Sequence, residues 1–377
     1  MTCDKRSFSV LGISMHAGLP LQNQFTKKLL GNESDKPLVR FLKSFASEAF
    51  GYYETHSHYW WPNLEDLFTF IDLSANTGHH LGTSYSPALL RTVRRSLIVR
   101  IIEMLEEECT CAPVKAQSER DSSITTGQQL LKSLAHRIHP GEDSGFIVLN
   151  WDTILEQILE KFRPDIRISY GSGIRPARFP SSGRIVIPEP DDQPNVHVIK
   201  IHGSVNWMYC DNCRQTFCFP PKESRKIAGA LLGRNDWDHV RSVLKEVTND
   251  EFDTKHWQCC NCREIELSTR LATFSYRKAL DFAMFETSWQ SAEALLRQAE
   301  KWIFIGYSLP AADYEFKYLL KRIQLSKGQR AAPKIITVVG DEKTANNYRQ
   351  LFGRSLEIVI DDGLSECNLN YIFGDMA

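Results

Sequence analysis

The segment GFIVLNWDTILEQILEKF, residues 145–162, decides the fold class because it joins a buried-type strand, a polar turn and a helix in immediate succession. Residues 145–149 form an apolar run of strand length, and residues 154–162 have apolar positions at helical spacing. The alternation recurs along the chain, with strands predicted at 8–12, 196–201, 302–305, 334–339 and 356–360. This pattern predicts an α/β fold in which a parallel sheet carries helices on both faces.

The composition is that of an ordinary globular protein, with 377 residues of which 42% are apolar and 24% charged. A chain of this length forms two units, or one large core with insertions. The formal net charge of −1 gives no overall basic field, so nucleic acid is expected only indirectly, through a partner. No apolar run reaches the roughly 18–20 residues of a membrane helix, and the first ten residues lack a signal-peptide pattern. We therefore predict a cytoplasmic protein with no membrane partner.

Two parts of the chain interrupt the strand–helix alternation. Residues 36–140 are mostly of helical pattern and are predicted to form a helical insertion, and residues 208–265 are predicted to form a small zinc-ribbon module. The remaining residues, 1–35, 141–207 and 266–377, are assigned to a Rossmann-like sheet domain. Residues 171–192 are rich in Gly, Pro, Ser and Arg and are predicted to be a surface loop. In the helical insertion, a solvated or assembly face is the interpretation favoured over a nucleic-acid site for Arg91, Arg94, Arg95 and Arg100.

Six of the ten cysteines lie in the small module, where two C-x-x-C pairs are typical of a tetrahedral zinc site. The predicted ligands are Cys210, Cys213, Cys259 and Cys262. The 45 residues between the pairs exceed the usual ribbon spacing and are partly helical in pattern. Cys218 and Cys260 are surplus thiols that could replace a ligand, and unrelated thiols are the alternative to a metal site. Four thiolates leave no open coordination position, so this zinc would be structural.

Polar residues follow four of the predicted strands, at the sheet edge where ligands bind in such folds. Each cluster alone has a plain structural explanation: a glycine turn, a helix cap, a satisfied histidine or the start of a helix. Together they make a functional edge the stronger interpretation. The clusters are Gly12-Ile13-Ser14, Asn150-Trp151-Asp152-Thr153, Lys200 to Trp207 with His202 and Gly203, and Gly306-Tyr307-Ser308-Leu309-Pro310 with Asp313 nearby.

In this order the clusters resemble the motifs of the sirtuin family. Residues 10–20 align without a gap with the family's G-A-G-x-S-x-x-A-G-I-P motif, and Asn150 and Asp152 match its asparagine–aspartate motif. His202-Gly203, followed by Cys210, matches the histidine–glycine motif and the first zinc knuckle. Residues 306–309 match the Gly-Thr-Ser-Leu motif. The variants Asn-Trp-Asp and Gly-Tyr-Ser-Leu-Pro are more similar to prokaryotic sirtuin-like proteins of anti-phage defence.

The resemblance implies a Rossmann-like domain that binds NAD+ as substrate, structural Zn2+, and cleavage of the nicotinamide–ribose bond. It implies Asn150 as the residue orienting water or ribose near C1′, His202 as general base and Asp152 as a residue that fixes the geometry. The NAD+-binding residues that it implies are Gly12, Ser14, Gly18, Gly306 and Ser308, and an acid at Asp341 could accept from the ribose hydroxyls. It also implies a homo-oligomer and a separate partner, either a HerA-like ATPase or an Argonaute-type protein.

Several positions depart from the family pattern and leave three functions open. Val10 and Leu11 replace the first Gly-Ala of the phosphate loop, and residues 271–276 replace the Phe-Gly-Glu segment that lines the peptide groove of deacylases. The missing groove segment favours water as acceptor, hence an NAD+ hydrolase that depletes NAD+ in abortive anti-phage defence. The alternatives are an NAD+-dependent protein deacylase and a non-catalytic NAD+ or ADP-ribose binder within a defence complex.

Overall fold

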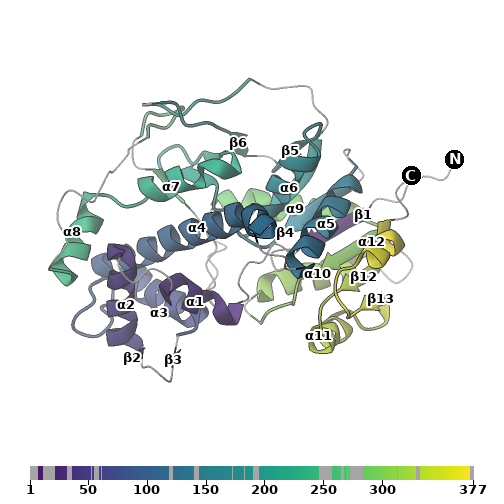
Figure 1. Ribbon diagram of the computed structural model, residues 1–377, viewed down its shortest axis with the longest axis horizontal. Helices are drawn as coiled ribbons and strands as arrows, with labels where there is room; N and C mark the ends of the chain where they lie inside the picture. The colour runs from purple at the N-terminus through teal and green to yellow at the C-terminus, as the bar shows by residue number, and fades with distance from the viewer. Residues whose placement is uncertain are drawn as a thin grey trace.

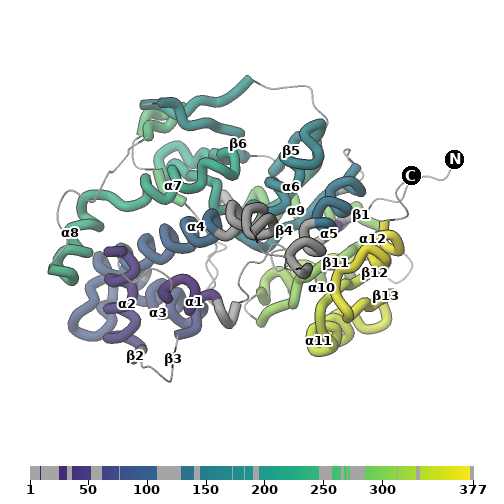
Figure 2. Tube along the Cα trace, viewed as in Figure 1, coloured from purple at the N-terminus to yellow at the C-terminus, as the bar shows by residue number. Residues whose placement is uncertain are grey.

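The structure is a computed structural model of the chain. It describes residues 7–11, 22–31, 36–51, 53–54, 59–60, 62–118, 122–139, 144–171, 173–181, 183–189, 195–245, 257–264, 267–269, 271, 283–311, 313–327 and 332–373. Figures 1 and 2 show a helical body on one side of the molecule and a sheet with its covering helices on the other.

A seven-stranded sheet forms the centre of the second body, and all of its strand pairs are parallel. Its order is β13-β12-β11-β1-β4-β7-β5. The strands predicted from sequence are present within one or two residues of their expected bounds. The strands are β1 (Ser7–Leu11), β4 (Ser144–Val148), β5 (Arg167–Ser169), β7 (Asn195–Lys200), β11 (Lys301–Ile305), β12 (Lys334–Val338) and β13 (Leu356–Ile360).

Helices cover both faces of this sheet, which confirms the predicted fold class. Successive strand residues alternate between two cores: Phe146 and Val148 join one, whereas Ile147 joins the other. The first core contains side chains of α5 (Ser122–His136), α6 (Ile154–Phe162) and α12 (Glu366–Phe373). The second contains side chains of α9 (Ala283–Gln298), α10 (Tyr314–Ser326) and α11 (Glu342–Phe352).

The helical body is arranged around one long helix, α4 (Pro87–Ser118). On one side α4 contacts α1 (Gln22–Gly31), α2 (Pro37–Phe50) and α3 (Leu64–Thr77), and on the other it contacts α7 (Ser224–Ala230) and α8 (Arg234–Val243). A short hairpin of β2 (Tyr53–Glu54) and β3 (Tyr59–Trp60) lies between α2 and α3 in sequence. Among the described residues of the stretch 36–140, helices are the main elements.

Helix α8 is fixed to α4 by a buried polar cluster. Arg95 forms a bidentate ion pair with Asp236, and the Thr92 hydroxyl donates to the same carboxylate at 2.7 Å. Thr92 is fully buried, and Asp236 is 5% exposed. The segment between the two cysteine pairs thus packs against the helices of the first insertion.

A second sheet, ordered β10-β8-β9-β6, carries the cysteines. Its strands are β6 (Ile174–Pro176), β8 (Trp207–Cys210), β9 (Thr216–Cys218) and β10 (Leu267–Ser268), and the 3-10 turns η2 (Pro221–Glu223) and η4 (Gly353–Ser355) complete the elements. The prediction of a surface loop at residues 171–192 was wrong in part, because β6 pairs with β9 and Phe179 is buried. The ring of Phe179 stacks on Phe219 with centroids 4.0 Å apart, so apolar side chains hold this segment against the module.

Within the described residues, no helix combines the length and the apolar character that crossing a membrane requires.

Candidate active site

The strand order places a topological switch point at the carboxyl ends of β1 and β11. From β1 the chain crosses to β4 on one side, whereas from β11 it crosses to β12 on the other. Neighbouring parallel strands whose connections leave in opposite directions form a topological switch point, where ligands bind in open α/β sheets. The loop after β1 carries Gly12, Ser14 and Gly18, which lie outside the described residues.

The loop after β4 is tied to the loop after β7. The Trp151 carbonyl accepts from the Val205 amide at 3.0 Å and from the Ser204 hydroxyl at 3.3 Å. Asp152 is buried and its Oδ1 accepts from the amide of Ile154, the first residue of α6, at 3.1 Å, so its carboxylate holds the turn that leads into the helix. Asn150 is half-buried at the head of this loop.

His202 reaches across to the same loop. Its Nδ1 lies 3.1 Å from the carbonyl oxygen of Leu149, the residue before Asn150. In the other direction its Nε2 lies 3.8 Å from Oδ1 of Asp313, a residue that immediately precedes α10. The histidine is 6% exposed, and Gly203 behind it has a φ of +82°, which lets the chain turn sharply there. The structure therefore brings the segments of Asn150 and His202 together.

A buried ion pair lies beneath this loop. Lys200 Nζ is 3.0 Å from Glu156 Oε1, with side-chain exposures of 0% and 2%, and it also donates to the Asp152 carbonyl. The Tyr170 hydroxyl donates to the same Glu156 oxygen at 3.2 Å, and burial raises the pKa of Tyr170 well above its usual value. Glu156 was not among the predicted site residues, because it lies between Leu155 and Gln157 in a helical pattern and nothing in the spacing marks it.

The turn after β11 alternates exposed and buried residues. Gly306 and Ser308 are exposed toward the carboxyl edge, whereas Tyr307 and Leu309 are buried. Both Gly306, at φ +67°, and Leu309, at φ +53°, adopt the left-handed conformation, which is costly for leucine and is often found at functional sites. The Asn347 amide donates to the Ser308 carbonyl at 3.2 Å. This places the two expected cofactor-binding residues at the switch point.

Asp341 follows β12 at the same edge and caps α11. Its carboxylate accepts from the amide and the hydroxyl of Thr344, each at 2.8 Å. These hydrogen bonds, the amide first, lower the pKa of Asp341 below its usual value of 3.8. The side chain is exposed, so its capping role leaves it at the surface of the edge.

The four predicted cysteines converge. The Sγ atoms of Cys210, Cys213, Cys259 and Cys262 all lie within 4.8 Å of one another. The Cys210–Cys262 and Cys213–Cys259 distances are 3.5 and 3.7 Å. Tetrahedral zinc with Zn–S bonds of about 2.3 Å requires sulfur atoms about 3.8 Å apart, so the cluster fits the metal.

The two knuckles also share one backbone geometry. The Arg214 amide donates to the Cys210 carbonyl at 2.8 Å and the Arg263 amide donates to the Cys259 carbonyl at 3.0 Å, and both arginines have positive φ. Burial raises the pKa of Cys210 and Cys259, so metal binding would release their protons. Cys218 lies outside the cluster, in an apolar setting that raises its pKa to about 12.

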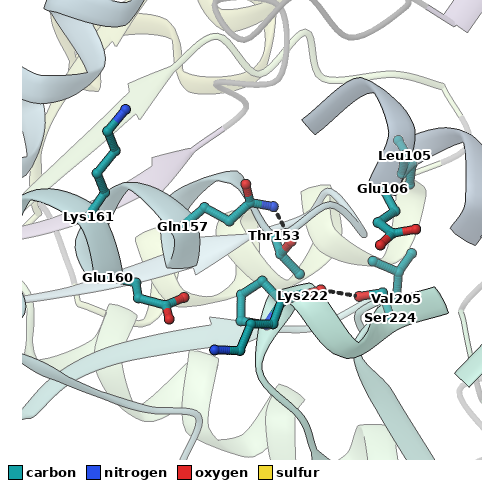
Figure 3. Close-up of a pocket in the computed structure, with 10 residues that line it drawn as sticks. Leu105, Glu106, Thr153, Gln157, Glu160, Lys161, Val205, Lys222 and Ser224 are labelled. Atoms are coloured by element: carbon teal, nitrogen blue, oxygen red, sulfur yellow. Dashed lines mark hydrogen bonds between the residues drawn. The ribbon is translucent and has the colours of Figure 1, made fainter. Parts of the chain in front are cut away.

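A cavity of about 240 Å³ lies beside the candidate site, where α4, α6 and the η2–α7 segment meet (Figure 3). Thr153, next to Asp152, and Val205, three residues after His202, line it together with Leu105 and Pro221. None of the described residues assigned to catalysis or NAD+ binding lines this cavity.

Comparison with known proteins gives structural matches alone. No protein-family model matches the chain, and no curated protein matches it. Several solved structures do. They are sirtuins.

One was solved to study sirtuin substrate affinity and aligns over 98% of this chain and 93% of its own, at 12% identity and a TM-score of 0.38. A complex of Sir2 with a p53 peptide and NAD+ aligns over 98% and 95%, at 13% identity and a TM-score of 0.35. A Sir2 complex with the inhibitor EX-527, 2′-O-acetyl-ADP-ribose and deacetylated p53 peptide aligns over 94% of this chain and 86% of its own. Its sequence identity is 15% and its TM-score is 0.31. With identities and TM-scores this low, the activity has to be argued from the chain's own residues.

Proposed function

We propose that the chain is a sirtuin-like NAD+ hydrolase that cleaves the nicotinamide–ribose bond. The observation that carries the proposal is the meeting of the Asn150 and His202 segments beside the switch point of a doubly wound parallel sheet. Ligands of such sheets lie beyond the carboxyl ends of the strands, where these residues lie. The order of the sequence motifs supports NAD+ as that ligand.

The edge has the length that an extended dinucleotide covers. Asp341, Gly306, Asn150 and His202 follow β12, β11, β4 and β7, and β1 lies between β11 and β4. Four strand spacings of about 4.8 Å make about 19 Å from β12 to β7. The adenosine ribose would lie toward Asp341, the phosphates over Gly306, Ser308 and the loop with Gly12, Ser14 and Gly18, and the nicotinamide ribose toward Asn150.

The reaction needs a residue that orients water and a residue that accepts its proton. The bond between C1′ and the nicotinamide nitrogen breaks, and its electron pair leaves with nicotinamide. Asn150 would hold the attacking water or the ribose hydroxyls, because an amide can donate and accept at once. His202 Nε2 would take the proton from the water as its oxygen bonds to C1′, giving nicotinamide, ADP-ribose and a proton. Asp152, held by the Ile154 amide, would fix the loop that carries Asn150.

The choice of water over an acyl-lysine as acceptor rests on the sequence, where the peptide-groove segment of deacylases is missing at 271–276. We further propose that the activity serves anti-phage defence as part of an oligomer with a separate ATPase or Argonaute-type partner. The four-cysteine cluster has a structural task in this scheme, because four thiolate ligands leave no open coordination position for a substrate.

A chromatographic time course of NAD+ tests the hydrolase. The wild type should release nicotinamide and ADP-ribose, and Asn150→Ala and His202→Ala should each lower the rate by at least about 100-fold. His197→Ala is the matched control. His197 lies within β7, the strand that precedes His202, but away from the carboxyl end of that strand. Equal rates in wild type, Asn150→Ala and His202→Ala would refute the assignment. Production of O-acetyl-ADP-ribose from acetylated peptide would instead establish a deacylase, and NAD+ binding without turnover would establish a binder.

A further inference from the structure

Asp313 is a buried acid that faces the histidine of the candidate site. It is 6% exposed and lies directly before α10, and its Oδ1 is 3.8 Å from His202 Nε2. Its side chain makes no capping hydrogen bond to α10, although a residue at this position often does. The carboxylate therefore points toward the histidine instead of serving its own helix.

The hydrogen bond on the other side of the ring fixes the tautomer of His202. A backbone carbonyl can only accept, so the Nδ1 atom 3.1 Å from the Leu149 oxygen must carry the hydrogen in this contact. In the neutral ring Nε2 then holds the lone pair, and it faces the carboxylate of Asp313. At 3.8 Å the two groups are beyond hydrogen-bond distance but close enough for a strong charge interaction once Nε2 takes a proton.

Two buried tyrosines hold the carboxylate in place. The Tyr307 hydroxyl donates to Asp313 Oδ2 at 2.7 Å, and the Tyr348 hydroxyl donates to the Tyr307 carbonyl at 2.6 Å. Burial raises the pKa of both phenols well above the usual value, so they remain donors. The turn that carries the chain from Tyr307 to Asp313 includes Leu309 in its left-handed conformation. Tyr307 therefore holds Oδ2, while Oδ1 is the carboxylate oxygen 3.8 Å from His202 Nε2.

We propose that Asp313 is the acidic partner of His202, a positioning residue whose fixed negative charge stabilises the histidine when it accepts a proton at Nε2. This rests on the proposed function, in which His202 is the general base. Among the residues that the structure describes, Asp313 at the start of α10 is the charged group that faces the ring, and the uncharged Trp289 of α9 lies beside it. The neutral Tyr307 after β11 donates to Asp313. The ring centroids of His202 and Trp289 are 6.5 Å apart.

The size of the effect follows from the distance. A carboxylate within about 4–6 Å favours the charged form of a histidine by about one pKa unit or more. Replacing Asp313 by asparagine keeps the shape and an oxygen for Tyr307 but removes the charge. The proton affinity of His202 should therefore fall about tenfold, and the weaker base should lower kcat while leaving KM nearly unchanged.

An NMR titration of histidine-labelled protein tests this without any turnover. The His202 resonance, assigned by its loss in His202→Gln, should titrate about one pH unit lower in Asp313→Asn than in wild type. Asp165→Asn, which removes an exposed carboxylate near β5, should leave it unmoved. Asp313→Ser replaces Asp313→Asn if that variant does not fold. An unchanged or higher His202 titration in the charge-removing variant would overturn the proposal.

The pH profile of NAD+ cleavage gives the second readout. The limb in which activity rises with pH should move to lower pH in Asp313→Asn, in step with the titration. A raised KM with unchanged kcat would overturn the proposal, because it would place Asp313 in substrate binding. If the wild type does not cleave NAD+ at all, the proposed function fails, and the titration still decides whether Asp313 acts on His202.

Discussion

The Lys200→Met substitution removes a fully buried ammonium from beneath the loop that carries Asn150. In wild type this group pairs with Glu156 at 3.0 Å and donates to the Asp152 carbonyl. Methionine fills most of the lysine's volume, so the main change is the loss of charge. Glu156, only 2% exposed, is left as a buried carboxylate facing an apolar side chain. Breaking one partner of such a pair costs about 3–5 kcal/mol, which is more than a 100-fold change in the folding equilibrium.

Urea unfolding followed by tryptophan fluorescence measures this cost. The matched control is Lys334→Met, because Lys334 and Glu357 form the same kind of pair at 2.8 Å with exposures of 59% and 43%. Exposed pairs contribute about 0–1 kcal/mol, so the control should unfold nearly as wild type does. Adding Glu156→Leu to Lys200→Met should recover much of the loss, since both charges are then gone. Equal costs for Lys200→Met and Lys334→Met, or no recovery in the double variant, would refute the reasoning.

Removing zinc with a chelator, or replacing Cys213 by serine, should lower the Tm by several degrees, because the four thiolates join both knuckles of the small sheet. Cys260→Ser, outside the cluster, should leave both Tm and bound zinc unchanged; a Tm insensitive to zinc would count against a structural site. Asp341→Ala should cost about 1 kcal/mol through the lost α11 cap. Because the folded pKa of Asp341 lies below its unfolded value of 3.8, this contribution should be present above that pH and disappear as the pH falls through the folded pKa. Asp341→Asn keeps an oxygen at the cap but cannot ionise. A difference in unfolding free energy between wild type and Asp341→Asn that stays constant with pH would contradict this assignment.

The inner strands of the sheet were predictable because most of their residues are buried. The residues of β11 and β12, for example, are almost all buried, so both strands appear in the sequence as short continuous apolar runs. Helix α6 has its predicted bounds because its apolar periodicity starts at Ile154, directly after the polar residues Asp152 and Thr153. The two C-x-x-C pairs likewise predicted the cysteine cluster, because ligand spacing within a knuckle is local.

Contacts between distant segments were not predictable in this way. Arg95 and Arg100 were interpreted as a solvated or assembly face, but Arg95 pairs with Asp236, 141 residues away, and Arg100 is 2% exposed. The spacing of apolar residues identifies α4 as a helix. It does not show which other helices pack on it, because α4 is covered by several of them. Asp313 was noted only as lying near the Gly306–Pro310 cluster and was given no role for a similar reason. Its position near His202 depends on the left-handed turn at Leu309 and on the hydrogen bonds of Tyr307 and Tyr348.

Because α7 and α8 pack onto α4, two segments that are far apart in the sequence depend on each other for burial. Thr92 and Ser96 on α4 are fully buried, and Asp236 of α8 supplies the carboxylate that Thr92 and Arg95 need. Deleting α7 and α8, which lie between the two cysteine pairs, would expose polar and apolar side chains of α4, more than a hundred residues earlier in the sequence. A shortened version of the chain should therefore lack both the helical segment 36–140 and the segment between the two cysteine pairs, or keep both.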